Sequence, residues 1–381
     1  MLKQDVVLKR EYNFTFGILT SLAIIFVVAG HLNYNFFSID GLFPHYSFHM
    51  GLFMFISGYF YKSDYEDKII YFLKKKFLNL VIPYFIWNLF YGIVVIILKK
   101  YGFAIGSEIN LYTFFFQPFV DGHQFYFNLS AWFLLVLFEV EVIYLLIRKL
   151  FRVLIHNDVL GLMTLLAITF ILGGAGIILS NQGYNYSGWL VLVRIMFFIP
   201  FYCLGNVYNC LLEKYDNLNN IVYFIVVLGI QFLVVMHYGW VPTFSAVFGT
   251  FFGNPIMQYI VAINGIAFWL RIAKIITPIV NEESYLLKLG RNSFTIMMHH
   301  IAIIYILEII LYYFNKVTGV LGDIDINTIK TSAGSWYILN GNQHFLLFYL
   351  IMTLISCVCI KDIGIKLKKL CFKNKQNKGE K

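Results

Sequence analysis

Long apolar stretches recur through this chain and constrain its fold more than any other feature. Each holds roughly 20 residues with few charges, the length that an α-helix needs to cross a bilayer. Of the 381 residues, 60% are hydrophobic and 13% are charged, whereas soluble domains have about 25% charged residues. The pattern predicts an all-α polytopic membrane protein with about ten transmembrane helices. We expect these helices at Phe14–Leu32, Tyr46–Tyr61, Phe77–Leu98, Ser130–Ile147, Val159–Leu179, Gly188–Leu212, Ile221–Tyr238, Pro255–Leu270, Ser293–Phe314 and Phe345–Ile360.

Basic residues are distributed unevenly among the segments that connect these stretches. With both termini cytoplasmic, the inner segments hold 24 of the 29 Lys and Arg residues and the outer segments hold four. Cytoplasmic loops are enriched in Lys and Arg, so we expect this orientation. One membrane-embedded domain then covers residues 1–381, with a basic cytoplasmic tail at about 361–381. The net charge of +9 reflects membrane orientation, and no nucleic-acid partner is expected.

His31 ends the first apolar stretch and is the first catalytic candidate. An ionisable side chain in hydrocarbon is costly, and therefore marks a functional site by default. An imidazole, with an unperturbed pKa of about 6.5, can also exchange protons near neutral pH. The cysteines show no zinc spacing, and no metal is expected.

Further polar residues in the apolar stretches are candidates for catalysis or for orienting a substrate. Glu139 lies seven residues after Trp132 and shares its helix face, whereas Glu141 points to nearly the opposite side. Glu139 is a candidate partner for Arg194 or for a protonated histidine, and a structural ion pair is the alternative. Arg194 itself could hold a carboxylate, a phosphate or an oxyanion.

Two more histidines belong to this group. His300 follows His299 directly, so about 100° of helix separates them and only one can face a given site. His49 lies near small residues that allow close helix packing. For His49 and His300, a packing role is the alternative to an acceptor-orienting one.

A basic run precedes the third expected helix. The segment 65–79 combines Lys68, Lys74, Lys75 and Lys76 with apolar residues, which predicts an amphipathic helix at the membrane interface. Such a helix anchors to anionic lipid, and it could also attract a polyanionic cytoplasmic cofactor.

Six short motifs occur in order along the chain. They are His31 at the end of the first helix, SFHMGLFMFISGYF at 47–60, KKKFLNLVIPY at 74–84, AWFL at 131–134, FYCLG at 201–205 and LGRNSFTIMMHH at 289–300. Together with the ten expected helices, they span about 350 residues. In this pattern the chain resembles the acyltransferase 3 family of bacterial membrane O-acyltransferases.

The resemblance implies an acyl-CoA-dependent O-acyltransferase, with acetyl-CoA as the usual donor. The acceptor would be a hydroxyl of an extracytoplasmic cell-surface polysaccharide or lipid-linked sugar, and the location the cell (plasma) membrane. His31 matches the family's essential first-helix histidine and His300 matches a second family histidine. Lys74, Lys75 and Lys76 would attract the acyl-CoA. An arginine that many members carry eleven residues before the first histidine is replaced by Thr20.

Two other classes of function fit the same pattern. An exporter or flippase of a polysaccharide or glycolipid also uses about ten helices with buried charges. A third hypothesis is that the protein is a non-catalytic subunit of an assembly. Homo-oligomers or partner enzymes of glycan biosynthesis are compatible with each class.

Overall fold

A computed structural model describes residues 12–33, 39, 41–122, 124–331 and 344–379 of the chain. Helices form nearly all of its regular structure, with strands only at β1 (Phe244–Ser245) and β2 (Thr250–Phe251) in the part described. The long helices are α1 (Phe14–His31), α4 (Ile82–Lys100), α6 (Trp132–Leu154), α7 (Asp158–Asn181), α8 (Ser187–Val207), α9 (Asn220–Tyr238), α10 (Pro255–Ile276), α12 (Ser293–Thr318) and α14 (His344–Gly379). The shorter ones include α2 (His49–Tyr59), α3 (Ile69–Lys76), α5 (Gln117–Val120), α11 (Tyr285–Arg291) and α13 (Ile326–Thr331).

Nine helical stretches in the described ranges are long and apolar enough to cross a membrane. The prediction of an all-α polytopic membrane protein is therefore confirmed. One of the nine is continuous over Ile69–Lys100, because α3 passes through a π-helical turn at Phe77–Val81 into α4. The expected basic tail falls in the second half of α14, where side chains from residue 365 on lie outside the description.

The second expected helix is shorter than predicted. α2 has 11 residues, against the predicted range Tyr46–Tyr61, because Phe48 adopts a non-helical φ of −148° and separates α2 from a short 3₁₀ turn. The predicted segment Tyr46–Tyr61 nevertheless runs antiparallel to α1 and packs along it. The Tyr46 hydroxyl donates to the carbonyl oxygen of Gly30, at the end of α1. Tyr59 stacks on Phe16, at the start of α1, with 3.5 Å between ring centroids.

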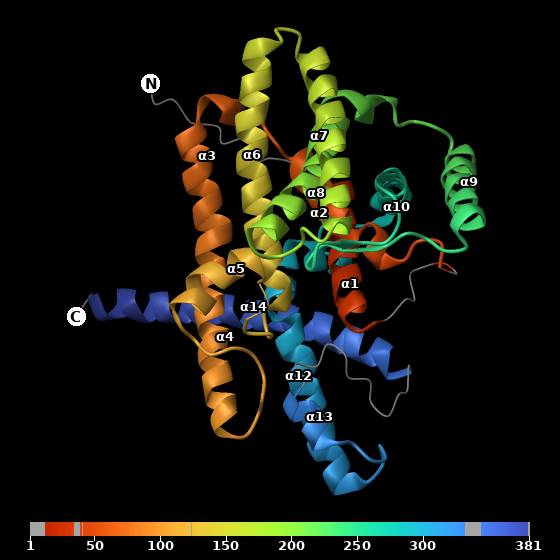
Figure 1. The fold of residues 1–381 in the computed structure, drawn as a ribbon. Coiled ribbons are helices and arrows are strands. Elements are labelled where there is room, and N and C mark those ends of the chain that lie inside the picture. Colours follow the sequence, from red (N-terminus) through yellow and green to blue (C-terminus); the bar gives the residue numbers. More distant parts are fainter. Residues whose placement is uncertain (1–11, 34–38, 40, 123, 332–343, 380–381) are drawn as a thin grey trace.

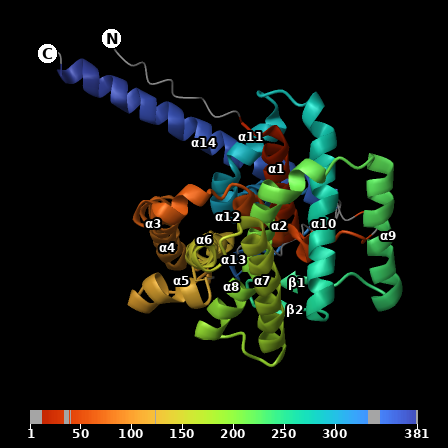
Figure 2. The same ribbon diagram turned by 90° about the horizontal axis from the view of Figure 1, so that it is seen from above.

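The helices do not form a parallel bundle. α6 is seen from the side in Figure 1 and along its axis in Figure 2. α10 is seen along its axis in Figure 1 and from the side in Figure 2, so the two helices cross at a steep angle. In both views α3 and α4 lie on one flank, and α9 and α10 on the other. Between them α2 packs against α8, and α8 packs against α7. This central group holds the largest buried hydrophobic cluster.

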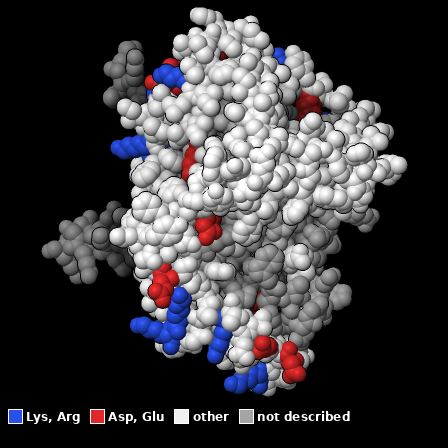
Figure 3. Space-filling view, viewed as in Figure 1, with Lys and Arg blue, Asp and Glu red and all other residues white. Residues whose placement is uncertain are grey.

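Ion pairs gather the predicted cytoplasmic segments at one end of the molecule. Arg148 and Arg152 both approach the buried carboxylate of Glu66, with nitrogen–oxygen distances of 3.9 and 3.4 Å. Asp216 is held between Arg271 and Lys274. In Figure 3 most visible Lys and Arg atoms lie toward one or the other end of the molecule, with a broad, mostly uncharged surface between the two ends.

Asp216 lies just outside a spanning segment and shows how these clusters are stabilised. Burial by itself would raise the pKa of its carboxyl group, but Lys274 and Tyr208 donate hydrogen bonds of 2.8 and 2.7 Å to Oδ2. The net effect lowers the pKa below its ordinary value. The carboxylate therefore stays ionised at neutral pH and joins the segment after α8 to α10.

Two glycines allow α2 and α8 to touch backbone to backbone. A Cβ atom on Gly58 would overlap the carbonyl oxygen of Tyr202, and one on Gly205 would overlap the carbonyl oxygen of Phe55. Small residues of this kind favour close helix approach in membranes, where packing drives association. The position of α2 beside α8 thus depends on the absence of side chains at these two sites.

We expect Gly205→Ala to destabilise the protein by about 1–3 kcal/mol, because the added methyl group has no space and the helices must separate. Thermal unfolding of the purified protein in lipid nanodiscs would measure the effect. Gly229→Ala, on α9, is the matched control, since nothing lies within 4 Å of a Cβ atom there. Equal unfolding temperatures for the two variants would contradict the close packing.

Candidate active site

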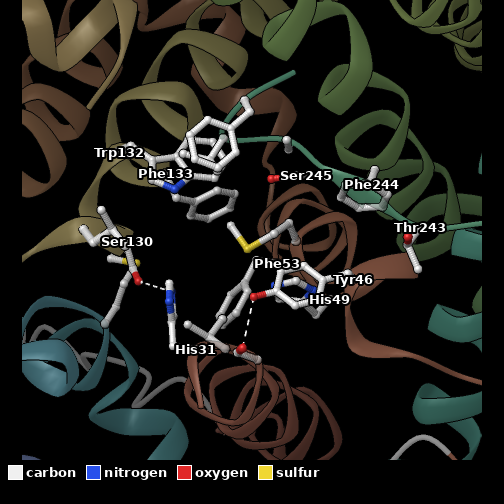
Figure 4. Close-up of a pocket in the computed structure, with 18 of the residues that line it drawn as sticks. His31, Tyr46, His49, Phe53, Ser130, Trp132, Phe133, Thr243, Phe244 and Ser245 are labelled. Carbon is white, nitrogen blue, oxygen red and sulfur yellow. Dashed lines mark hydrogen bonds between the residues drawn. The ribbon is translucent and has the colours of Figure 1, made fainter. Parts of the chain in front are cut away.

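A cavity of about 570 Å³ lies where α1 ends and α6 begins. α1 ends at His31 because Asn33 adopts a left-handed φ of 53°, a conformation that asparagine tolerates. The start of α2 and the β1–β2 hairpin (Thr243–Phe252) complete the walls. Aromatic side chains form much of the lining, namely Phe53, Trp132, Phe133, Phe244, Phe248 and Phe252. Figure 4 shows His31 beside Ser130 on one side of the cavity, with Thr243 far from them on the other.

Ser130 joins two of the candidate histidines. Its Oγ lies 2.8 Å from Nε2 of His31 and 3.2 Å from Nε2 of His300. His300 Nδ1 lies 2.8 Å from the carbonyl oxygen of Ile296, one turn earlier on α12. The ring centroids of the two histidines are 5.0 Å apart. The end of α1, the turn that leads into α6 and the first third of α12 therefore meet at one polar cluster, which we call the Ser130 cluster (His31, Ser130 and His300).

With both histidines neutral, one arrangement of protons satisfies these three contacts. The Ile296 carbonyl can only accept, so His300 Nδ1 carries the ring proton and Nε2 carries the lone pair. Ser130 then donates its single hydroxyl proton to His300, and its oxygen accepts from Nε2–H of His31. In this arrangement the lone pair of His31 is on Nδ1.

The neighbouring histidines occupy different environments, as the sequence predicts for adjacent helical positions. His300 is completely buried in the Ser130 cluster. His299 faces α4, where its Nδ1 lies 2.7 Å from the hydroxyl of Tyr91 and its ring meets the edge of Trp87. His299 therefore packs against α4, and His300 faces Ser130.

His49 lies on a second part of the cavity wall. Its Nδ1 donates to the carbonyl oxygen of His45 at 2.6 Å, and the ring of Tyr46 stands perpendicular to it at 5.3 Å. These contacts fix the imidazole beside the cavity. A role for His49 in orienting an acceptor stays a prediction.

Arg194 holds the hairpin wall in place. Its guanidinium donates to the backbone carbonyl oxygens of Ala246 and Asp121, at 3.2 and 3.1 Å, and also to that of Val247. The same group lies 4.9 Å from the ring centroid of Trp132. Among the residues described, no direct ion pair joins Arg194 to Glu139, although the two charges interact at longer range. The role of Glu139 stays a prediction. Loop carbonyls inside the protein need donors, and Arg194 supplies them.

The other charged candidates lie away from the Ser130 cluster. Glu141 pairs with Lys76, whose Nζ is 2.5 Å from its carboxylate oxygen. Lys75 donates to the hydroxyl of Tyr65 at 3.2 Å, and Lys74 is exposed. Among the cavity-lining residues that the structure describes, none is Asp, Glu, Lys or Arg.

A second cavity, of about 620 Å³, opens near the start of α1. Thr20, which replaces the arginine of many acyltransferase 3 members, lies in its wall, together with Lys62 and Asn209. Thr20 precedes His31 by eleven residues, which is about 16 Å along an α-helix. The two cavities therefore lie at opposite ends of α1. The second is at the end that carries the basic clusters, namely Arg148 and Arg152 around Glu66, and Arg271 and Lys274 around Asp216.

Sequence reasoning did not identify Ser130 or the hairpin wall. Ser130 directly precedes the AWFL motif at 131–134, and this position before a buried helix was the available signal. The hairpin segment 243–252 has neither helical periodicity nor charge, so its place beside His31 follows only from the fold.

We expect Arg194→Met to loosen the hairpin, because the carbonyl oxygens of Ala246 and Val247 lose their donor. A hydrogen bond to a charged group contributes about 1.5–3 kcal/mol, so amides of residues 243–252 should exchange with deuterium about tenfold faster or more. Arg152→Met, at the far end of the molecule, is the control. Unchanged exchange in Arg194→Met would show that other contacts hold the hairpin.

Comparison with known families covers nearly the whole chain. The Acyl_transf_3 family, described as an acyltransferase domain, matches residues 18–362. No curated protein and no solved structure matches the chain significantly. With its apolar helices and the Ser130 cluster inside the matched range, the chain belongs to the Acyl_transf_3 family and is a multi-pass membrane acyltransferase.

Proposed function

We propose that this acyltransferase transfers an acyl group, with acetyl as the proposed group, from cytoplasmic acyl-CoA to a hydroxyl of an extracytoplasmic cell-surface polysaccharide or lipid-linked sugar. The plasma membrane is the proposed location. The observation that carries the proposal is the position of His31 in an aromatic cavity at the end of α1 opposite the basic clusters. A base at this position could meet an acceptor from outside the cell.

The chemistry requires that a weak nucleophile lose its proton. As the acceptor oxygen attacks the acyl carbonyl carbon, a new C–O bond forms and the hydroxyl proton passes to His31. The bond from the acyl carbon to sulfur breaks, and the CoA thiolate takes that proton from His31 and leaves as the free thiol, so that His31 is neutral again. General-base assistance of this kind contributes about 10²- to 10⁴-fold in rate.

The donor is proposed to bind at the basic end. The second cavity opens there, and Lys62 is in its wall. Lys74 is exposed on α3 and could attract the phosphates of CoA, whereas Lys76 is held by Glu141. Lys62 would then supply positive charge near Thr20, at the place where many family members have arginine.

The acceptor cavity also favours one class of substrate. Burying an ionised group without a partner is costly, and the described lining offers no charged side chain. Its aromatic rings and few hydroxyls suit the apolar face and hydroxyls of a sugar. We therefore expect the part of the acceptor that occupies this cavity to be uncharged.

His31→Ala should lower acylation of surface glycan by about 10²-fold or more, because the acceptor hydroxyl loses its base. The measurement is the O-acyl content of the surface glycan in a deletion strain complemented with each variant. His156→Ala, an exposed histidine, is the control. His31→Gln, which keeps a hydrogen-bonding side chain, should be equally inactive at equal protein level in the membrane.

Two outcomes would contradict this function. Full acylation with His31→Ala would exclude His31 as the base. Unchanged acylation in the deletion strain, with loss of the surface polymer itself, would instead identify the chain as an exporter.

Ser245→Asp tests the uncharged cavity. The new carboxylate would face an apolar wall, so we expect acylation to fall about tenfold or more from the cost of burying an unpaired charge. Ser245→Asn has a similar shape without charge and should stay active. Equal acylation by the two variants would show that the cavity does not select uncharged groups.

A further inference from the structure

We propose that Ser130 carries the acyl group as a covalent ester, so that transfer takes place in two steps. This inference rests on the proposed acyl transfer. It adds a nucleophile that the sequence motifs did not indicate, and it assigns separate roles to His300 and His31.

The Ser130 cluster has the parts of an activated nucleophile. Such a site needs a hydroxyl within about 2.6–3.2 Å of a base, and a third group that orients the base. Ser130 Oγ lies 3.2 Å from His300 Nε2, and the carbonyl oxygen of Ile296 accepts from His300 Nδ1–H at 2.8 Å. The carbonyl fixes the tautomer of His300, as a carboxylate does in a serine hydrolase triad.

Other hydroxyls around the cavity lack this arrangement. The Tyr46 hydroxyl donates to the backbone at Gly30. Thr243 and Ser245 lie in the hairpin wall, away from His31 in Figure 4. Within the described lining, Ser130 is the hydroxyl that has hydrogen bonds to histidine rings.

The position of Ser130 also suits the charge that forms during acylation. Ser130 lies in the turn Leu129–Ala131 that leads into α6, a helix of 23 residues. The N-terminus of a helix carries a partial positive charge. Attack on a carbonyl creates an oxyanion, and helix N-termini are among the groups that stabilise developing negative charge.

The first step loads the enzyme. Ser130 Oγ attacks the carbonyl carbon of acyl-CoA and forms a C–O bond, while the hydroxyl proton passes to His300 Nε2. The C–S bond breaks, and the thiolate takes that proton from His300 and leaves as free CoA. The products are the Ser130 ester and the thiol, with both histidines neutral again.

The second step unloads the enzyme. The acceptor hydroxyl oxygen attacks the ester carbonyl, and its proton passes to Nε2 of His31, which carries the lone pair in the acyl-enzyme because the ring proton has moved to Nδ1. The C–O bond to Ser130 breaks, and the departing Oγ takes the same proton back from His31 Nε2, with which it is in contact at 2.8 Å. His31 is then neutral again, and its ring proton returns from Nδ1 to Nε2 by exchange with solvent before the next cycle.

Two steps also fit the placement of the cavities. The cavities at Thr20 and at His31 lie at opposite ends of α1. With an ester on Ser130, the donor can leave before the acceptor occupies the cavity. The 570 Å³ space then has to hold one substrate at a time.

Isotope exchange tests the ester without an acceptor. Purified protein in nanodiscs is incubated with acetyl-CoA and radiolabelled CoA, because an enzyme that forms an acyl intermediate and free CoA must exchange label between the two. We expect exchange by the wild type and a fall of about 10⁴-fold or more in Ser130→Ala, since members of such a triad act as a unit. His156→Ala, at an exposed position outside both cavities, should exchange normally.

Direct detection gives the second measurement. After incubation with [¹⁴C]acetyl-CoA alone, mass spectrometry should find an acetyl ester on the peptide that contains Ser130. Ser130→Cys should carry the label as a thioester, which neutral hydroxylamine releases, and this result also shows that a variant at this position folds. His300→Ala should slow labelling, whereas His31→Ala should still accept label but fail to pass it on.

The outcomes separate this inference from the proposed function. If the wild type acylates surface glycan in a His31-dependent way but shows neither exchange nor ester, transfer is direct and the inference is overturned. Exchange that persists in Ser130→Ala would overturn it as well, because the nucleophile would lie elsewhere. If neither glycan acylation nor exchange occurs, the proposed function itself is wrong.

Discussion

Polar groups inside a membrane protein must find partners within the protein, and this constraint explains the main features of the structure. Hydrocarbon offers no hydrogen bonds, so an unsatisfied buried group is costly. Ser130 meets this requirement for two histidines at once. Arg194 meets it for the carbonyl oxygens of the hairpin, and Lys76 meets it for Glu141. Each of these contacts joins segments that are far apart in the sequence, so satisfying them also fixes the positions of the helices.

The packing around these contacts places the Ser130 cluster at one end of α1 and positive charge at the other. Gly58 and Gly205 bring α2 against α8, and Phe16 stacks on Tyr59, so α2 returns along α1. The loop before α2 then lies beside His31, while the basic clusters gather where α1 begins. Each end has its own cavity. In the proposed function, the donor from the cytoplasm and the acceptor from outside would reach one site by separate routes.

Part of this arrangement could be predicted from the sequence. The long helices follow from the requirement for about 20 apolar residues per span, and most predicted boundaries lie close to those of α1, α7, α9 and α12. His31 was identifiable because an ionisable group at the end of an apolar stretch is rare. The expectation that His299 and His300 face different neighbours is confirmed by their contacts, because helix geometry alone determines it.

Other features depended on contacts between distant segments. The sequence could not place Ser130, because serine is common at helix ends and becomes notable only when two histidines approach it. Glu139 was a reasonable partner for Arg194 by charge, yet the fold brings loop carbonyls to the guanidinium first. By itself, then, the sequence determined the class of protein, its helices and one histidine, because these follow from local periodicity and the length of a membrane span. The tertiary structure decided the contacts of Ser130 with the two histidines, the tautomer of His300 and the uncharged wall, because hydrogen bonds and cavities depend on where separate helices meet.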